Sequence, residues 1–249
     1  MDRVQLTPAW VLHRRDFRDS SQIVELLTAE HGRVSVVAKG IKRPKSRLRG
    51  LLQPFRLLRV SWVAKRELGT LTDVDAESSP PTALSGDALL AGYYVSELCL
   101  KLTHKHDPHP ELFDLYGQVI EALRSSASVD ACLRPFEDRL LRELGFGVNW
   151  SVDIETGQSV EPQYRYTMVP NSGPRRVADA ALEVDSIGGD YLLQIADGDW
   201  SATETRRVGR HILARALDVQ LEGKTLQTRR VLREMRNHVS PRTNNESKH

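Results

Sequence analysis

The sequence predicts an α+β protein, with a β-rich N-terminal part followed by a mostly α-helical remainder. Two observations carry this prediction. Between residues 10 and 77 the chain has five short segments rich in Val, Leu, Ile and Thr, and several alternate apolar and polar residues as strands do. Pro80 and Pro81 then interrupt the pattern, and the apolar residues that follow recur at helical spacing.

The five β-rich segments lie close together and leave no room for a helix of normal length between them. They cover residues 10–17, 21–30, 32–40, 54–65 and 67–77. The sequence His31-Gly32-Arg33 is typical of a tight turn between the second and third segments. Five short strands in such a span fit a small closed barrel of the OB type. We therefore expect an OB-type domain over residues 1–80.

The remainder of the chain predicts a helical domain over residues 81–237. Helices are expected over 84–104, 109–126, 130–145, 203–218 and 223–236. Ser85 or Asp87 could cap the first helix and Asp130 the third, and Gly145 would end the third. Clusters of Gly, Pro, Asn and Ser over residues 148–200 indicate an irregular insertion of turns and short strands. Residues 238–249 have almost nothing apolar and predict a disordered tail.

Composition excludes several classes of protein. The 249 residues are 40% hydrophobic and 27% charged, which is ordinary for a globular protein. The sequence has no uninterrupted apolar stretch of membrane-spanning length, and its N-terminus is too charged for a secretory signal. The two cysteines, Cys99 and Cys132, cannot form a disulfide framework or a CxxC zinc pair. We expect a cytoplasmic protein without a metal or other cofactor.

The formal net charge of +2 hides a segregated pattern. Residues 1–80 contain 15 Lys and Arg against 9 Asp and Glu, a balance of +6. Residues 81–200 carry −10, and residues 201–249 carry +6. Such a pattern predicts surfaces that bind a polyanion on a body that is not basic everywhere.

The strongest candidate for such a surface is the run Ala38–Gly50, which connects the third and fourth predicted strands. Its cations are Lys39, Lys42, Arg43, Lys45, Arg47 and Arg49, and no acidic residue lies among them. Arg14 and Arg15 precede the run in the same predicted domain. A flexible basic loop can follow a phosphate backbone and release its counterions, so we expect contact with nucleic acid. The alternative is a solvated loop whose charges only aid solubility.

Two further groups could take part in nucleic-acid binding. Trp10, Phe17, Phe55 and Trp62 could offer faces for bases to stack on. Phe55 and Trp62 are expected in the core, which leaves Phe17 as the best candidate for exposure. The predicted C-terminal helices carry Arg206, Arg210, Arg229 and Arg230, which are either a second phosphate-binding surface or the solvated faces of packed helices.

Catalytic or metal-binding arrangements are weak in this sequence. His104, His106, Asp107, His109 and Glu111 are close together, but Pro108 and Pro110 argue for a turn between helices instead of a metal cluster. Asp73, Asp75 and Glu77 alternate along a predicted strand. They would suit a metal-dependent nuclease, or more simply the solvent-facing edge of a strand. We expect a protein that is not an enzyme.

Several motifs occur in a characteristic order. They are VLH within residues 10–17, SQIVELLT, GRVSVVAKG, the basic loop and LQPF, then YYVSEL, DPHPELF, LRPFEDRLLRELGFGVN and GKTLQTRRVLREM. Together they resemble the bacterial RecO family of DNA repair and recombination proteins. The combination of motifs is specific, and the resemblance extends to about residue 237.

The resemblance implies a recombination mediator without enzymatic activity, located in the cytoplasm with the nucleoid. Such a protein binds single- and double-stranded DNA, anneals complementary strands and acts with RecR. It binds the acidic C-terminal tail of single-strand DNA-binding protein and helps to load RecA. Many members carry a four-cysteine zinc site, which this chain cannot form with two cysteines. The segment 148–200 would take the place of that site.

Binding an acidic tail requires cations beside an apolar pocket. The third predicted helix offers Arg134, Arg139 and Arg142 near Leu133 and Phe136, although arginines over a packed core would look the same. A different reading of the whole chain is an OB-fold RNA-binding protein in ribosome or transcript maturation. Preference for RNA over DNA would distinguish it, because the 2′-hydroxyl is the discriminating group.

Overall fold

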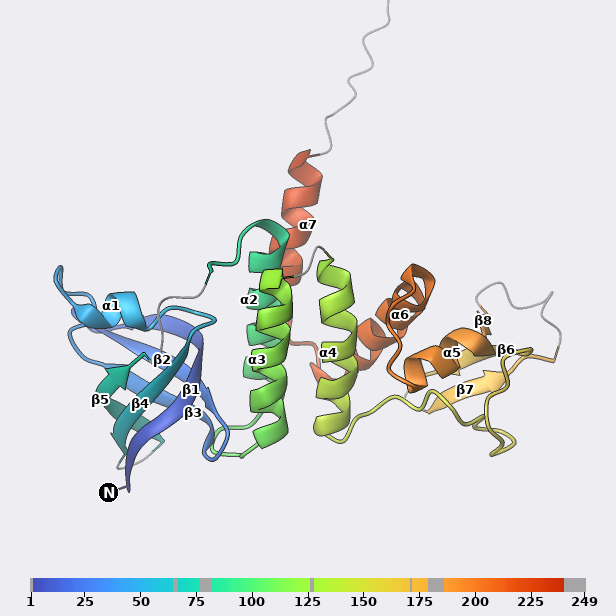
Figure 1. Cartoon of the computed structure of the whole chain (residues 1–249), viewed down its shortest axis with the longest axis horizontal. Coiled ribbons are helices and arrows are strands. Elements are labelled where there is room, and N and C mark those ends of the chain that lie inside the picture. The colour runs from blue at the N-terminus through green and yellow to red at the C-terminus, as the bar shows by residue number, and fades with distance from the viewer. Residues whose placement is uncertain are drawn as a thin grey trace, which may run out of the picture.

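A computed structural model describes residues 2–64, 67–76, 82–125, 128–170, 172–178 and 186–239. Figure 1 shows an elongated molecule with a β-barrel at one end, a group of helices in the middle and a small sheet at the other end. The order of these parts confirms the predicted α+β class, with a barrel first and helices after it.

The N-terminal barrel has five strands and is closed in the order β1-β2-β3-β5-β4. The strands are β1 (Asp2–Phe17), β2 (Ser21–Thr28), β3 (Gly32–Ala38), β4 (Leu57–Ala64) and β5 (Leu68–Asp75). The pairing of β3 with β5 is parallel, and the other four pairings are antiparallel. The five-stranded OB-type prediction is confirmed, but β1 begins well before residue 10. This long strand pairs with β4 in its first half and with β2 in its second, and irregularities in its register allow it to bend.

Alternation along β1 divides its side chains between two hydrophobic cores. Ala9 and Val11 point into the barrel, where they pack with apolar residues of β2, β3 and β4. Trp10 and Leu12 point outward and belong to the cluster that fills the helical part. Because successive residues of a strand face opposite sides, a single strand serves both cores.

All five expected helices are present. They are α2 (Gly86–Leu102), α3 (Pro110–Ser125), α4 (Val129–Glu143), α6 (Thr203–Gln220) and α7 (Gln227–Val239). The prediction of Asp130 as the cap of α4 is wrong. Ser128 occupies that position, and its hydroxyl accepts a hydrogen bond from the backbone N–H of Ala131 at 3.4 Å. Gly145 follows the end of α4 with a φ of +80°, as expected of a residue that stops a helix.

The segment 148–200 forms a small unit of its own at the far end of the molecule. Its strands β6 (Arg165–Val169), β7 (Gly173–Arg176) and β8 (Ile187–Gly188) form a sheet in the order β7-β6-β8. The short strands were expected, but the helix α5 (Gly189–Ala196) was not. Its sequence is too short to show a clear helical period, and it is helical because Leu192 and Ile195 are buried against the helical core.

Asp153 holds the first turn of this unit together. One of its carboxylate oxygens accepts hydrogen bonds from the backbone N–H groups of Glu155 (2.8 Å) and Thr156 (3.0 Å), and the other accepts one from Arg176 in β7 (2.8 Å). Burial opposes ionisation of this carboxyl, but the three backbone hydrogen bonds outweigh it and lower the pKa of Asp153. A carboxylate therefore links the turn to the sheet.

The barrel and the helices are joined first by aromatic packing. The Trp10 ring lies 5.5 Å from Tyr116 and 6.4 Å from Phe113, both on α3, measured between ring centroids. Gly117 makes room for it, because a Cβ atom there would lie 3.0 Å from the indole. Phe55, which precedes β4, also belongs to the helical core. The joint is thus a continuous hydrophobic cluster.

A second joint connects the β2–β3 hairpin with the turn between α2 and α3. Gly32 packs so closely on this turn that a Cβ atom would lie 2.0 Å from the carbonyl oxygen of Asp107. The backbone N–H of His106 donates to the carbonyl of Arg33 at 3.0 Å. The Arg33 guanidinium donates to the carbonyl of Thr103 at 2.9 Å and pairs with the buried Glu25 at 3.3 Å. The histidine-rich turn therefore acts as a contact between domains.

Some expectations fall on residues outside the described ranges. These are the proline boundary, within residues 77–81, and the tail from residue 240 onward. His238 and Val239, which were expected in the tail, are the last residues of α7. No helix in the described part of the chain is both long and apolar enough to cross a membrane.

The close contact at Gly32 predicts that Gly32→Ala weakens the joint between the domains. Both Gly32 and Gly157 have left-handed φ angles, but only Gly32 has an atom within 4 Å of its missing Cβ. Gly157→Ala should cost about 1 kcal/mol of stability from backbone strain alone. Gly32→Ala should cost about 1–3 kcal/mol more, because the turn must move away. Chemical denaturation of both variants measures the difference, and equal losses would contradict the close contact.

The hydrogen bonds of Asp153 predict a pH-dependent effect of Asp153→Asn. The lowered pKa means that folding favours the carboxylate, so its stabilisation is present at neutral pH and is lost as the pH falls through the folded-state pKa. The variant should melt at a lower temperature than the wild type at pH 7, and the gap should narrow below about pH 4. Thermal melts over this pH range test this, with Asp114→Asn on the exposed face of α3 as the control. A gap that is constant with pH would argue against the carboxylate's role.

Candidate nucleic-acid interface and partner pocket

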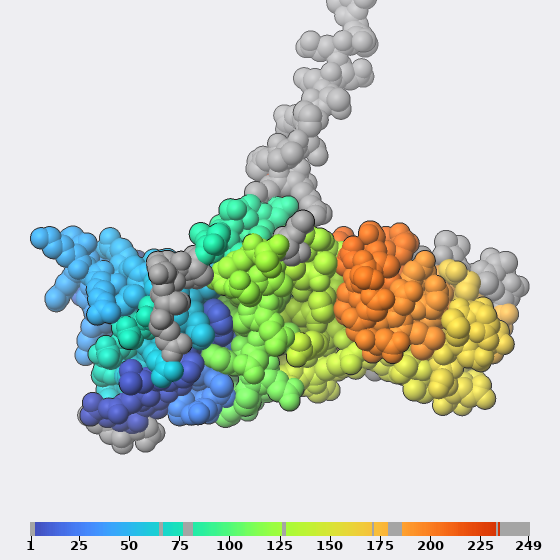
Figure 2. All heavy atoms as spheres, viewed as in Figure 1, coloured from blue at the N-terminus to red at the C-terminus, as the bar shows by residue number. Residues whose placement is uncertain are grey.

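The basic loop protrudes from the barrel at the end farthest from the small sheet (Figures 1 and 2). It contains a series of turns and the short helix α1 (Arg47–Leu51). Ile41 and Leu52 anchor it, because both side chains are buried in the barrel core. The backbone N–H of Lys42 also donates to the carbonyl of Ser20 at 3.1 Å. The anchors leave the residues between them on the surface.

The six cations of the loop divide into two groups. Lys42 pairs with Asp16 of β1 at 3.0 Å, Arg47 lies 3.7 Å from Asp75 of β5, and Arg49 donates to the carbonyl of Lys42. Lys39, Arg43 and Lys45 are exposed and have no carboxylate partner among the residues that the structure describes. Their charges are available to an anion without displacing a carboxylate, and so is the charge of Arg49, which donates only to a carbonyl.

Arg14 and Arg15 lie on β1 and differ in their surroundings. Arg15 is exposed, whereas Arg14 is half-buried and donates to the side-chain oxygen of Gln53 at 3.4 Å. Gln53 in turn donates to the carbonyl of Arg49. Burial lowers the pKa of the Arg14 guanidinium, and the nearby phenol of Tyr93 acts in the opposite direction. Arg14 is thus connected to the end of the basic loop.

Most of the candidate stacking rings are unavailable. Phe55 and Trp62 are buried, as expected, and so is Trp10. Phe17 is half-buried, with the guanidinium of Arg18 at 5.1 Å from its ring centre. Tyr93 of α2, which the sequence reasoning did not select, is exposed, and its ring lies 5.0 Å from that of Phe55.

The basic C-terminal helices hold their arginines in different ways. Arg206 is only 13% exposed, pairs with Asp130, and donates to the carbonyl of Trp200 at 2.6 Å. So small an exposed area leaves little of the Arg206 side chain for contact with a nucleic acid, which argues against the sequence-based expectation. Arg210 also pairs with Asp130 and Arg229 with Asp218, while Arg230 is exposed near Glu234. Each of these four arginines therefore has an acidic neighbour.

Helix α4 carries a buried ionic cluster on its inner face. Glu137 is 1% exposed, accepts a hydrogen bond from the hydroxyl of Tyr94 (2.7 Å) and forms an ion pair with Arg134 (2.6 Å). Burial raises the pKa of Glu137, and the charge of Arg134 opposes this rise. Arg134 also pairs with Asp130 at 3.3 Å and is only 8% exposed. The structure therefore removes Arg134 from the expected partner surface, and Phe136 with it, because that ring is buried in the helical core.

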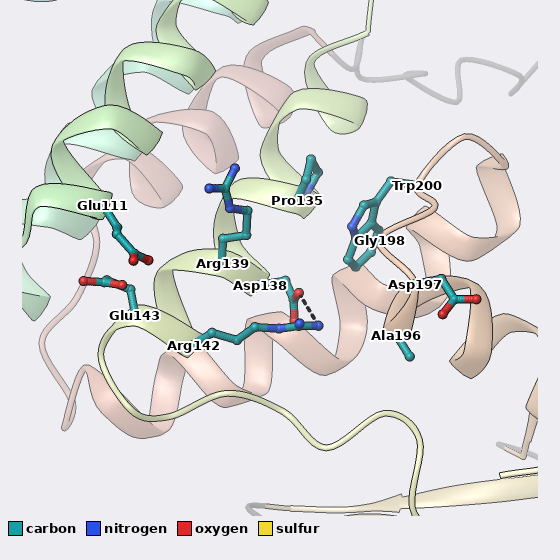
Figure 3. A pocket seen from close by; sticks show the side chains of 10 residues that line it. All are labelled: Glu111, Pro135, Asp138, Arg139, Arg142, Glu143, Ala196, Asp197, Gly198 and Trp200. Carbon is teal, nitrogen blue, oxygen red and sulfur yellow. Dashed lines mark ion pairs between the residues drawn. The ribbon is translucent and has the colours of Figure 1, made fainter. Parts of the chain in front are cut away.

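The outer face of α4 borders an open pocket of about 620 Å³. Figure 3 shows Arg139 and Arg142 between Glu111 and Glu143 on one side and Trp200 and Asp197 on the other. Arg142 pairs with Asp138 at 2.9 Å, and Asp138 also accepts from the indole N–H of Trp150 at 2.8 Å. Burial raises the pKa of Asp138, while these two donors favour its ionised form.

The apolar wall of the pocket comes from a different part of the chain than expected. Pro135 lies on α4, but Ala196 and Trp200 come from the end of α5 and the segment after it. Leu133 is half-buried against the helical core and does not line the pocket. Sequence reasoning missed Ala196 and Trp200 because they lie about sixty residues from α4, and only their apolar character in a polar segment marked them.

The alternative catalytic and metal interpretations find little support in the geometry. Asp75 is paired with Arg47, Asp73 is exposed beside it on β5, and Glu77 lies outside the described residues. His109 lies 3.3 Å from Asp107 and 3.5 Å from Glu143. Within the described ranges, no group of three or more His, Cys, Asp or Glu side chains is arranged to hold a metal ion.

Comparisons with known proteins now add to this geometry. Residues 1–80 match the family model for the N-terminal part of recombination protein O, and residues 83–230 match the model for its C-terminal part. The chain belongs to the RecO family. A DNA repair protein RecO from Azoarcus sp. (strain BH72) is 38% identical over 236 residues, which cover 94% of this chain and 97% of the relative.

Other RecO proteins are similar to nearly the same extent. The DNA repair protein RecO of Aromatoleum aromaticum is 37% identical over 94% of this chain and 97% of its own length. That of Methylococcus capsulatus is 36% identical over 93% of this chain and 94% of its own length. The RecO resemblance of the sequence motifs is therefore confirmed over both the barrel and the helical part.

Proposed function

We propose that this RecO-family protein is a mediator of DNA repair and recombination that binds single- and double-stranded DNA and anneals complementary strands without enzymatic activity. The observation that carries the proposal is the anchored basic loop, in which Lys39, Arg43 and Lys45 are exposed and free of carboxylate partners among the described residues. It works in the cytoplasm, with the nucleoid.

Annealing requires two polyanions to approach each other. Cations that contact phosphates lower the repulsion between the strands and release counterions. Contacts limited to the backbone leave the base edges free to pair with a complementary strand. The fixed ends and exposed middle of the loop suit this task, because the loop can follow a strand whose conformation changes while the barrel stays in place.

A second strand or a duplex would use cations elsewhere. Arg15 and Arg230 are exposed, and Arg210 and Arg229 become available if the DNA phosphates displace Asp130 and Asp218. We propose this second surface as weaker than the loop, since each displaced carboxylate offsets part of the gain.

The pocket beside α4 is the proposed site for the acidic C-terminal tail of single-strand DNA-binding protein. Arg139 and Arg142 would meet the carboxylates of the tail, and Pro135, Ala196 and Trp200 would contact its apolar end. Glu111, Glu143 and Asp197 also border the pocket and would repel other parts of an acidic peptide, which favours one orientation. Because the chain belongs to the RecO family, we also propose that it acts with RecR and helps to load RecA.

Charge reversal in the loop should abolish most DNA binding and annealing. The test variant is Lys39→Glu/Arg43→Glu/Lys45→Glu, and the matched control is Lys105→Glu/Arg207→Glu/Lys224→Glu, which changes the net charge equally at exposed cations that belong to neither proposed DNA surface. If about four loop cations meet phosphates, the log–log salt slope of single-strand binding should be near −3 in the wild type and near −1 in the loop variant.

Fluorescence energy transfer between complementary strands, bare or coated with single-strand DNA-binding protein, measures annealing directly. The loop variant should lose the acceleration that the wild type gives, and the control should keep most of it. A wild type that accelerates neither substrate would overturn the mediator proposal, and preferential binding of competitor RNA would favour the RNA-binding alternative. A control that anneals strands more weakly than the loop variant would show that the loop is not the main DNA site.

Binding of a tail peptide should depend on Arg139 and Arg142. A labelled peptide with the acidic C-terminal sequence of single-strand DNA-binding protein should bind Arg139→Ala and Arg142→Ala about tenfold more weakly, because each loses a hydrogen bond between charged groups. Arg207→Ala is the matched control, since Arg207 is 74% exposed and pairs only with Glu204 in the described structure. Fluorescence anisotropy measures the affinities, and equal binding by all three variants would place the tail elsewhere.

A further inference from the structure

Tyr93 is an exposed aromatic residue at the joint between the barrel and the helices. It lies on α2, where Ala91, Tyr94, Val95 and Leu98 are buried, yet its side chain is 41% exposed. Its ring meets the ring of Phe55 edge to face, with centroids 5.0 Å apart and an angle of 66° between planes. Among the described residues no other aromatic ring contacts it. Because its side chain is 41% exposed, part of its surface is open to a ligand.

The support beneath Tyr93 is rigid. Phe55 has a left-handed φ of +62°, which a bulky residue adopts only when its surroundings hold it there. Its ring is buried against Gly92, and its carbonyl accepts a hydrogen bond from Arg124 of α3 at 2.6 Å. Edge-to-face contact with a fixed ring restrains Tyr93, so little conformational entropy is lost when a flat ligand stacks on it.

Tyr93 is also connected to the basic loop. Gln53 accepts from Arg14 and donates to the carbonyl of Arg49, whose guanidinium donates to the carbonyl of Lys42. Phe55 follows Gln53 by two residues, and its ring lies 5.0 Å from the ring of Tyr93. The surface therefore continues from the loop cations through Gln53 and Arg14 to an open aromatic ring.

We propose that Tyr93 is a stacking platform for one base of the single strand whose phosphates the basic loop holds. Cations beside an aromatic face are the combination with which proteins bind single strands without reading sequence. Stacking uses the face of the base and leaves its pairing edge free, which suits annealing. The bases of a duplex are already stacked, so the platform selects single strands. This inference rests on the proposed DNA binding by the loop.

The experiment measures the affinity of the wild type and four variants for three kinds of DNA. Tyr93→Phe keeps the aromatic face, Tyr93→Leu keeps an apolar side chain against Phe55, and Tyr93→Ala removes both. Phe146→Ala is the control for loss of an exposed ring, since Phe146 is 50% exposed in the segment after α4. Each is titrated with a single strand, the same strand with abasic sites, and a duplex. Thermal melts identify any variant that is poorly folded.

Tyr93→Leu and Tyr93→Ala should bind the intact strand roughly tenfold more weakly than the wild type, because a stacked base is lost. Tyr93→Phe and Phe146→Ala should bind it like the wild type. All variants should bind the abasic strand and the duplex alike, since neither offers a base to stack. Tyr93→Leu is the informative variant, because it tests the aromatic face while it preserves packing.

Two results would overturn the inference while leaving the proposed function intact. One is wild-type affinity of Tyr93→Leu for the intact strand. The other is an equal loss on intact and abasic strands, which would indicate disturbed structure and not a lost base. If the loop variant Lys39→Glu/Arg43→Glu/Lys45→Glu itself binds DNA like the wild type, the proposed role of the loop fails, and the inference about Tyr93 fails with it.

Discussion

The contact of Trp10 with helix α3 is the constraint on which the rest of the arrangement depends. The strand β1 needs its alternate residues for the barrel interior, so Trp10 and Leu12 must be buried elsewhere, and α2 and α3 provide that cover. Gly117 lets the indole approach α3 closely, and Gly32 lets the β2–β3 hairpin approach the next turn. With two such joints, the barrel cannot rotate freely against the helices. The loop, Tyr93 and the pocket therefore keep fixed positions relative to one another.

The hydrophobic core of the helical part also determines which charged side chains of the helices are buried and which are exposed. Helix α4 has one face in the core, where Arg134 and Glu137 form an ion pair, and the opposite face on the pocket. A buried ion pair contributes little net stability, but removing one partner leaves a costly isolated charge. Arg134 and Arg206 are therefore structural residues, although they are of the same type as Arg139. Whether an arginine in this protein is open to a ligand follows from the face of the helix on which it lies.

The small sheet shows how a carboxylate can organise the irregular segment of a chain that has only two cysteines. The carboxylate of Asp153 accepts hydrogen bonds from three backbone N–H groups. It therefore holds three backbone positions around one side chain, as a metal ion holds its ligands. The unit then packs α5 against the helical core and brings Ala196 and Trp200 to the pocket beside α4. Its role here is to complete a wall of the pocket, which connects it to the proposed binding of a partner.

The sequence by itself determined the five strands, the long helices and the position of the basic loop. Each depends on the spacing of apolar residues or on charges that are close together in the chain. Such patterns can be recognised without knowledge of the tertiary structure. It did not reveal α5, the true cap of α4, or which cations are free. Lys42 and Lys45 look alike in the sequence, yet only Lys42 meets Asp16, from a distant part of β1. Likewise Tyr93 looks like one more apolar residue of an amphipathic helix. Only the tertiary structure decided these points, because exposure and ion pairing depend on residues that folding alone brings together.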